Sequence, residues 1–168
     1  MRLKTMLLIG GLAVVSAPAV AAGTDTPAKV EQVAPTIAPP PAGMGQVVFY
    51  RPSSMGALVS CRVHEAGAVV NKLPPGRYFV HQTTPGIHEY TVKSEATDKL
   101  KVNVEDGETQ YARCAINMGM FSGRPNLSTQ DRADFDKRGK KLKLQDPFQA
   151  KEDEDEKAEA KPTEAATN

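Results

Sequence analysis

Apolar and polar residues alternate along the middle of the chain with a period of two, which is the spacing of side chains on one face of a β-strand. The alternation is clearest between residues 99 and 105, where Leu100, Val102 and Val104 are separated by polar residues. The predicted strands are 46–51, 57–65, 69–73, 77–83, 87–92, 99–105 and 109–118. Short strands separated by turn signals at this spacing predict a β-sandwich or a small barrel.

Two turns carry information about register. Pro85-Gly86 lies between two predicted strands and indicates a hairpin, which would place His81 and His88 in neighbouring positions on one face. At Asp106-Gly107, a two-residue turn would put Cys114 on the lysine face of the preceding strand, whereas a bulged three-residue turn puts it on the apolar face. The apolar pattern favours the bulged turn.

The last part of the domain has a different pattern. Residues 128–131, Ser-Thr-Gln-Asp, resemble a helix start, and Gly139 would end a short helix that carries Ala133 and Phe135. Residues 140–144 fit either a last strand or the beginning of a tail.

The N-terminus has the three parts of a secretory signal peptide over residues 1–22. Arg2 and Lys4 precede an apolar run, 6–15, that is too short to span a bilayer. Small residues follow, and they predict cleavage after Ala21 or Ala22. We therefore expect a periplasmic or secreted protein.

Two further segments lack periodicity. Residues 23–45 are rich in Pro and Ala and predict a disordered leader, and residues 146–168 predict a disordered, charged tail. One domain, 46–145, remains between them.

Charge and cysteine content limit the classes of function that we expect. The chain has 21 Lys+Arg and 20 Asp+Glu. Loss of the two positive charges of the signal peptide leaves 19 against 20, a net charge of −1, which gives no global field for nucleic acid. Because two cysteines in an exported chain favour a disulfide over free thiols, we predict a bridge between Cys61 and Cys114. The first cysteine lies far from the cleavage point, so no lipid anchor is expected.

Few residues suggest chemistry. His64, His81 and His88 could together hold zinc or copper, although their spacing matches no metal signature and surface histidines are the commoner outcome. The sequence contains no nucleophile elbow and no phosphate-binding loop, so we expect neither an enzyme nor a cofactor.

Two surface segments allow a binding role beside a plain structural one. A basic segment could bind a polyanion, or it could pair with the acidic block at 152–156; its residues are Lys137, Arg138, Lys140, Lys141 and Lys143. The loop 118–121, Met-Gly-Met-Phe, is either a partner contact or a strand end tucked against the core.

The stretch from Gly45 to about Met118 carries four short motifs. They are Val47-Val48-Phe49-Tyr50-Arg51-Pro52, Leu73-x-x-Gly76-x-Tyr78, Pro85-Gly86-x-His88 and Val102-x-Val104-x-x-Gly107-x-x-x-Tyr111. In their order and spacing the chain resembles a bacterial family known only as a domain of unknown function, number two-eight-four-six. The resemblance implies a single β-sandwich, related in shape to small surface modules with a Pro-Glu-Gly-Ala turn motif. Members are often envelope lipoproteins, whereas this chain lacks the lipobox cysteine. The resemblance implies no activity and no catalytic residues.

We therefore predict an all-β protein, a single β-sandwich of immunoglobulin or transthyretin type with a short C-terminal helix and disordered termini. The expected function is a non-enzymatic module that binds an unknown component of the cell envelope. We expect no nucleic-acid partner, membrane span or lipid anchor. The alternatives are metal binding through the histidines and polyanion binding through the basic segment.

Overall fold

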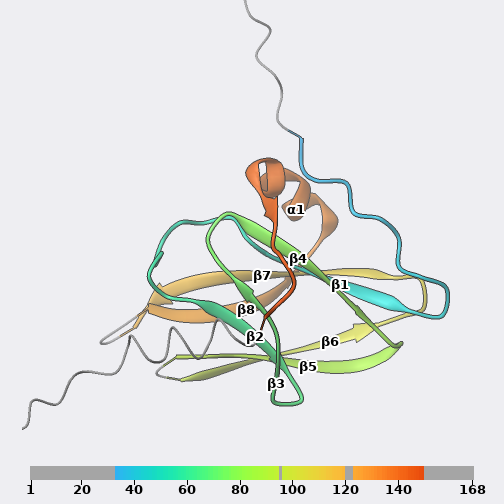
Figure 1. Cartoon of the computed structure of the whole chain (residues 1–168), viewed down its shortest axis with the longest axis horizontal. Helices are drawn as coiled ribbons and strands as arrows, with labels where there is room; N and C mark the ends of the chain where they lie inside the picture. Colours follow the sequence, from blue (N-terminus) through green and yellow to red (C-terminus); the bar gives the residue numbers. More distant parts are fainter. Residues whose placement is uncertain (1–32, 95, 120–122, 150–168) are drawn as a thin grey trace, which may run out of the picture. The chain divides into compact units, whose positions relative to one another are not determined.

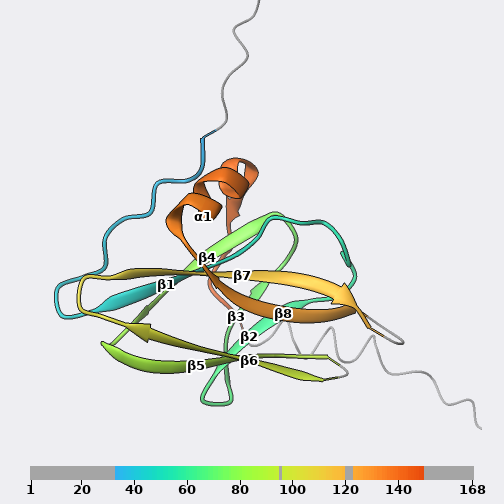
Figure 2. The same ribbon diagram turned by 180° about the vertical axis from the view of Figure 1, so that it is seen from behind.

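Two β-sheets pack face to face in the computed structural model, which describes residues 33–94, 96–119 and 123–149 (Figure 1). The five-stranded sheet has the order β8 (Gly123–Gln130), β7 (Thr109–Met118), β1 (Gly45–Arg51), β4 (Arg77–Thr83) and β9 (Lys143–Leu144). The four-stranded sheet has the order β3 (Ala68–Leu73), β2 (Cys61–Glu65), β5 (Gly86–Lys93) and β6 (Thr97–Val104). Figure 2 shows the same two layers from behind. The prediction of an all-β sandwich is confirmed, and strands β1 to β7 correspond to the seven that the alternation predicted, although β2 begins at Cys61 and not at residue 57.

A short helix, α1 (Arg132–Arg138), lies outside the five-stranded sheet and continues into a 3₁₀ turn, η1 (Gly139–Lys141). The Asp131 side chain caps the helix by accepting a hydrogen bond from the Asp134 N–H at 2.7 Å, and the Gly139 N–H donates to the Phe135 carbonyl. The predicted helix is confirmed, but residues 128–130 belong to strand β8 instead of its start. This strand was not predicted from the sequence because it contains Pro125, which an edge strand tolerates and a central strand does not.

Apolar side chains form two clusters, one on each face of the five-stranded sheet. The inner cluster fills the space between the sheets and includes Phe49, Phe79 and Tyr90. The outer cluster packs Tyr50 of β1 against Phe135 of α1, with ring centroids 5.2 Å apart. Every residue of β1 is buried because each face of this strand is covered by one of the clusters.

Both predicted hairpins are wrong. The strands on either side of Pro85-Gly86, β4 and β5, lie in different sheets, and so do β6 and β7 on either side of Asp106-Gly107. Even so, Cys114 of β7 shares the inner cluster with Val102 of β6, as the apolar pattern required, because the two strands face each other across the core. Alternation identifies the buried face of a strand but not the strand that pairs with it.

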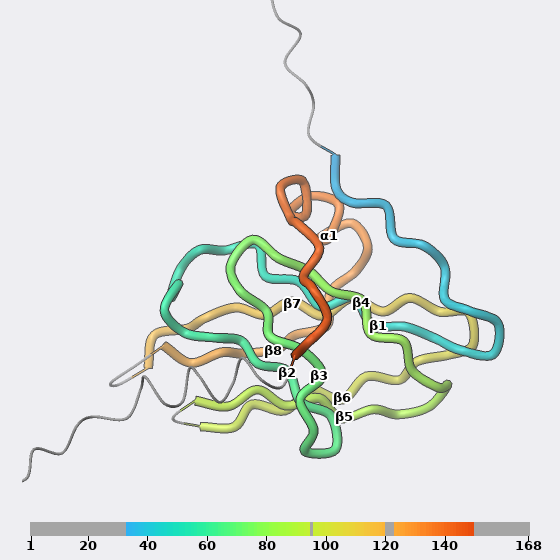
Figure 3. Tube along the Cα trace, in the orientation of Figure 1, coloured from blue at the N-terminus to red at the C-terminus, as the bar shows by residue number. Residues whose placement is uncertain are grey.

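The prediction of a disordered leader over residues 23–45 is wrong for the part that the structure describes. Residues 33–44 run along the outer face of the five-stranded sheet (Figure 3). Ala34 and Ile37 pack against the outer cluster, and the buried Gln46 side chain donates to the Ala38 carbonyl at 2.7 Å. Apolar contacts with α1 therefore stabilise a segment whose composition suggested disorder. Residues 23–32 lie outside the described part of the chain.

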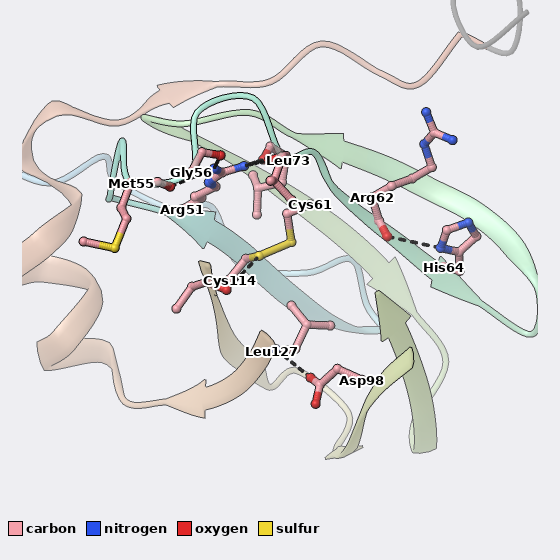
Figure 4. Close-up of a disulfide and its surroundings, with 12 residues drawn as sticks. Arg51, Met55, Gly56, Cys61, Arg62, His64, Leu73, Asp98, Cys114 and Leu127 are labelled. Atoms are coloured by element: carbon pink, nitrogen blue, oxygen red, sulfur yellow. Dashed lines mark hydrogen bonds between the residues drawn. A yellow bond between two sulfur atoms is a disulfide. The ribbon is translucent and has the colours of Figure 1, made fainter. Parts of the chain in front are cut away.

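The disulfide between Cys61 and Cys114 is confirmed, and both cysteines are fully buried (Figure 4). It joins β2 of one sheet to β7 of the other across the inner cluster. Because it closes a loop with a sequence separation of 53, restriction of the unfolded chain contributes about 4 kcal/mol in the chain-entropy model.

Arg51 is buried near the disulfide, with 1 % of its surface exposed. Its guanidinium donates to the carbonyls of Val59 at 2.7 Å and Gly56 at 2.8 Å, and it has longer bonds to those of Met55 and Leu73 (Figure 4). Burial lowers the pKa of Arg51 from its usual value. The side chain thus satisfies the inward carbonyls of the loop 52–60 and fixes the shape of that loop.

Replacement of Arg51 by Met should lower the free energy of unfolding by about 3 kcal/mol, because it leaves these carbonyls buried without donors. Urea unfolding at neutral pH measures the loss. The control is Lys101→Met, at an exposed position, which should change stability by no more than about 0.5 kcal/mol. A loss below about 1 kcal/mol for Arg51→Met would contradict this account.

Asp134 ties α1 to the five-stranded sheet. It accepts hydrogen bonds from the Tyr50 hydroxyl at 2.5 Å and from Arg138 Nε at 2.7 Å, and it pairs with Arg113 at 3.2 Å. Burial acts to raise the pKa of Asp134, but the hydrogen bonds from Tyr50 and Arg138 and the two arginine charges outweigh it and lower the pKa below 3.8. Ionised Asp134 therefore stabilises the fold above about pH 4, and this contribution disappears as the pH falls through its folded pKa.

The variant Asp134→Asn should be less stable than wild type by about 2 kcal/mol at pH 7, and the difference should shrink below about pH 4. Denaturant midpoints measured from acid to neutral pH test this. Asp136→Asn is the matched control, because Asp136 makes only an exposed ion pair with Arg132 and should contribute about 0.5 kcal/mol or less. A difference that stays constant with pH would show that the charge of Asp134 is not responsible.

Candidate functional site

The two sheets are tied together along one side of the sandwich. There Asp98 of β6 accepts hydrogen bonds from the Leu127 N–H at 2.8 Å and the Asn126 side chain at 3.1 Å, both on β8. At the other side the outer strands are β3 and β4, and the short strand β9 covers only the beginning of β4. This side of the sandwich holds a groove.

The groove between β3 and β4 has a volume of about 620 Å³ and is mainly apolar. One wall comes from β3, one from β4, and the third from the C-terminal segment. The lining residues are Val69, Val70, Asn71, Phe79, Val80, His81, Leu144, Gln145, Pro147 and Phe148.

The C-terminal segment runs parallel to β4 where β9 pairs with it (Figure 3), and the residues that follow line the groove. The Lys143 N–H donates to the Gly76 carbonyl at 3.0 Å, and the Gln145 N–H donates to the Tyr78 carbonyl at 2.7 Å. Farther along, the Asn71 side chain of β3 donates to the Asp146 carbonyl at 3.1 Å. The predicted disordered tail therefore begins later than residue 146, since residues 146–148 lie against the groove; residues 150–168 are outside the described part.

Much of the β4 edge has no partner strand in the described part of the chain. Pairing with β9 ends at Tyr78, whose carbonyl faces β9. Backbone groups point to alternate sides along a strand, so those of Val80 and Gln82 also face this edge. Beyond Tyr78 the edge can therefore accept a further extended chain.

A cluster of polar side chains lies at one end of the groove. Glu65 of β2 accepts hydrogen bonds from His81 Nε2 at 2.8 Å and from His88 Nδ1 at 2.6 Å. His81 belongs to β4 in the opposite sheet, so this carboxylate links the two sheets on their open side. His88 Nε2 faces the Thr84 carbonyl at 2.8 Å, so both ring nitrogens of His88 lie against oxygen atoms.

Tyr90 packs beneath both histidine rings, at centroid distances of 5.9 Å from His81 and 6.2 Å from His88. Burial raises the pKa of Tyr90 well above its usual range, and the nearby charge of Glu65 adds to the effect. The cluster therefore holds one carboxylate against two imidazoles and a neutral phenol. It links the two sheets, and it presents His81 to the groove.

The structure brings together two of the three histidines suggested as metal ligands, His81 and His88, and places His64 elsewhere. His64 directs its Nδ1 to the Arg62 carbonyl (Figure 4). Because side chains alternate along β2, His64 lies on the opposite face from Glu65. Within the described ranges, no group of three or more His, Cys, Asp or Glu side chains is arranged to hold a metal ion. The sequence reasoning missed Glu65, although position 65 continues the alternation of Cys61 and Val63 and so faces inward.

The basic segment is exposed, as a binding role would require. Arg138 is held by Asp134, whereas no described carboxylate pairs with the four lysines of the segment, Lys137, Lys140, Lys141 and Lys143. The acidic block at 152–156 lies outside the described part, so pairing between the two segments stays a prediction, and so does polyanion binding.

The predicted cleavage residues Ala21 and Ala22 also lie outside the described residues. Among the described helices none has the length and apolar character needed to cross a bilayer. A search of curated proteins and a search of solved structures each found no match to the chain.

The comparison with family models gives one match. The model described as "Protein of unknown function (DUF2846)" matches residues 41–124, half of the chain. The matched residues include both strand walls of the groove, the Glu65 cluster and Arg51, and they end before α1 and β9. The resemblance seen in the sequence is therefore confirmed, and the chain belongs to the DUF2846 family of proteins of unknown function.

Proposed function

We propose that this protein is an exported, non-enzymatic module of the cell envelope that binds an extended, partly apolar segment of another protein in the β3–β4 groove. Export is supported by the N-terminal sequence pattern and fits the disulfide between Cys61 and Cys114, which persists in oxidising compartments. The binding role is supported by the groove and by the incomplete pairing of β4.

A single observation carries the proposal: the chain pairs its own residues Lys143–Leu144 with the edge of β4 as a short parallel strand, and the residues that follow line the groove. The hydrogen bonds of that strand stop at Tyr78, although β4 continues to Thr83. An extended partner segment can continue the sheet along the free backbone groups of Val80 and Gln82, which is the geometry of β-strand addition.

The groove also supplies selectivity. A strand added to β4 directs alternate side chains toward the apolar wall formed by Val69, Val70 and Phe79. Its main-chain hydrogen bonds provide affinity that is independent of sequence, while these apolar contacts favour segments with apolar residues at every second position. The expected ligand is therefore an extended peptide with alternating apolar residues.

The Glu65 cluster supports a binding role more than a catalytic one. Both carboxylate oxygens of Glu65 are engaged by histidines, and His88 is engaged on both ring nitrogens. Because these side chains satisfy one another's hydrogen bonds, they act as a structural link between the sheets. Such a link keeps the β4 wall of the groove at a fixed distance from the four-stranded sheet.

Peptide display tests the proposal, with the immobilised protein as bait and wild type compared with Gln82→Pro and Gln82→Thr. Gln82 is exposed, and its N–H faces the free edge, so proline removes a donor without breaking the ladder to β1. We expect enrichment of extended sequences with alternating apolar residues. These should lose about tenfold or more in affinity for Gln82→Pro and keep their affinity for Gln82→Thr, which retains the donor.

Enriched peptides that bind Gln82→Pro as tightly as wild type would overturn the proposed edge pairing. Failure to enrich any peptide class would overturn the peptide-binding function itself. Unfolding midpoints of the two Gln82 variants, measured alongside, separate loss of the edge donor from loss of the fold.

A further inference from the structure

Three large apolar side chains are exposed at one end of the sandwich, away from the groove contacts described above. Leu58 is 103 % exposed and Met55 is 64 % exposed, both in the loop 52–60, and Met118 at the end of β7 is 90 % exposed. The alternative in which the loop 118–121 tucks against the core is therefore wrong for Met118, and residues 120 and 121 lie outside the described part of the chain. We call these three side chains the apolar tip.

Close packing holds the two parts of the apolar tip together. A Cβ on Gly56 would lie 2.6 Å from Ile116 Cγ2, so the loop 52–60 lies directly on β7. A Cβ on Gly123, the register partner of Met118, would lie 3.0 Å from Val59. The loop therefore crosses the end of the β7–β8 pair.

The loop is held in this shape from within. Arg51 binds the carbonyls of Met55, Gly56 and Val59, and the disulfide at Cys61 anchors the point where the loop ends (Figure 4). In the same view the Met55 side chain points away from the arginine. A buried cation thus fixes a loop whose large apolar side chains face water, whereas loops at protein surfaces are commonly polar.

The two segments that carry the apolar tip are free of charge. The loop 52–60 contains no Asp, Glu, Lys or Arg, and neither does the sequence 117–123; Arg124 is the first charge that follows. Entry of the tip into an apolar phase therefore carries no charged side chain from either segment, and the charges that lie beside Met118 are those of Asp98 and Arg124, which line a surface hollow together with it.

The size of the tip indicates what covers it. A stable protein interface buries about 800 Å² on each partner, far more than three side chains can supply. Binding to a lipid surface does not require so large an area, because the transfer of each single apolar side chain into the acyl boundary is favourable. We propose that Met55, Leu58 and Met118 insert into the interfacial region of a lipid bilayer, so that the protein is held at the membrane surface by its folded domain.

The chain has no tryptophan, so a single one introduced at the tip reports its own surroundings. The variant Leu58→Trp, mixed with vesicles of phosphatidylethanolamine and phosphatidylglycerol, should show a blue-shifted emission and quenching by brominated lipids. The matched control is Ile87→Trp on β5, a position that is 75 % exposed and outside the tip, where neither change is expected. Absence of a shift at position 58, or equal shifts at both positions, would overturn the proposal.

Vesicle sedimentation gives a second readout, with protein in the form that producing cells accumulate. Replacing both Leu58 and Met118 by serine should reduce the partition coefficient by about tenfold or more, and Ile87→Ser should leave it unchanged. Binding that disappears at high salt yet is unaffected by the double replacement would assign membrane attachment to the basic segment and overturn the role of the tip. Neither result depends on the Gln82 variants, so this inference and the peptide-binding proposal fail separately.

Discussion

Strand β1 has two apolar faces, and covering both of them governs the rest of the structure. Its seven residues are all buried, so the five-stranded sheet cannot be stable with one face in water. The four-stranded sheet covers the inner face through Phe49. The outer face, with Tyr50, requires Phe135 of α1 together with the extended residues Ala34 and Ile37. The segments that flank the sandwich in the sequence therefore become part of the fold, because they cover the outer face of its central strand.

The same requirement produces the groove. The chain must cross the outer face to place Phe135 and Leu142 in the outer cluster, and this path brings residues 143–148 to the edge of β4. The segment pairs with β4 over only two residues, and no other described residues form a strand along the rest of that edge. The opposite side of the sandwich needs no such segment, because Asp98 joins β6 to β8 directly.

At the end of the sandwich that carries the disulfide, charge and covalent chemistry act together. Burial of Arg51 is tolerated because main-chain carbonyls of the loop 52–60 replace the water that the guanidinium loses. Cys61, bonded to Cys114, fixes the exit of the same loop. The loop held in this way leaves the Leu58 side chain exposed to water. The groove and the apolar tip are therefore separate consequences of how this small domain satisfies its buried groups.

The sequence by itself determined the strands β1 to β7, the short helix and the disulfide pair, because each depends on local periodicity or on which face of a strand is inward. It could not determine that β4 and β5 belong to different sheets, since alternation is the same for a hairpin and for a crossing between layers. Glu65 joins His81 to His88 only because strands from both sheets meet at that point. The defined path of residues 33–44 depends on contacts with the surface of α1, which lies far along the chain. Contacts of this kind are set by three-dimensional packing, which a pattern of neighbouring residues does not record.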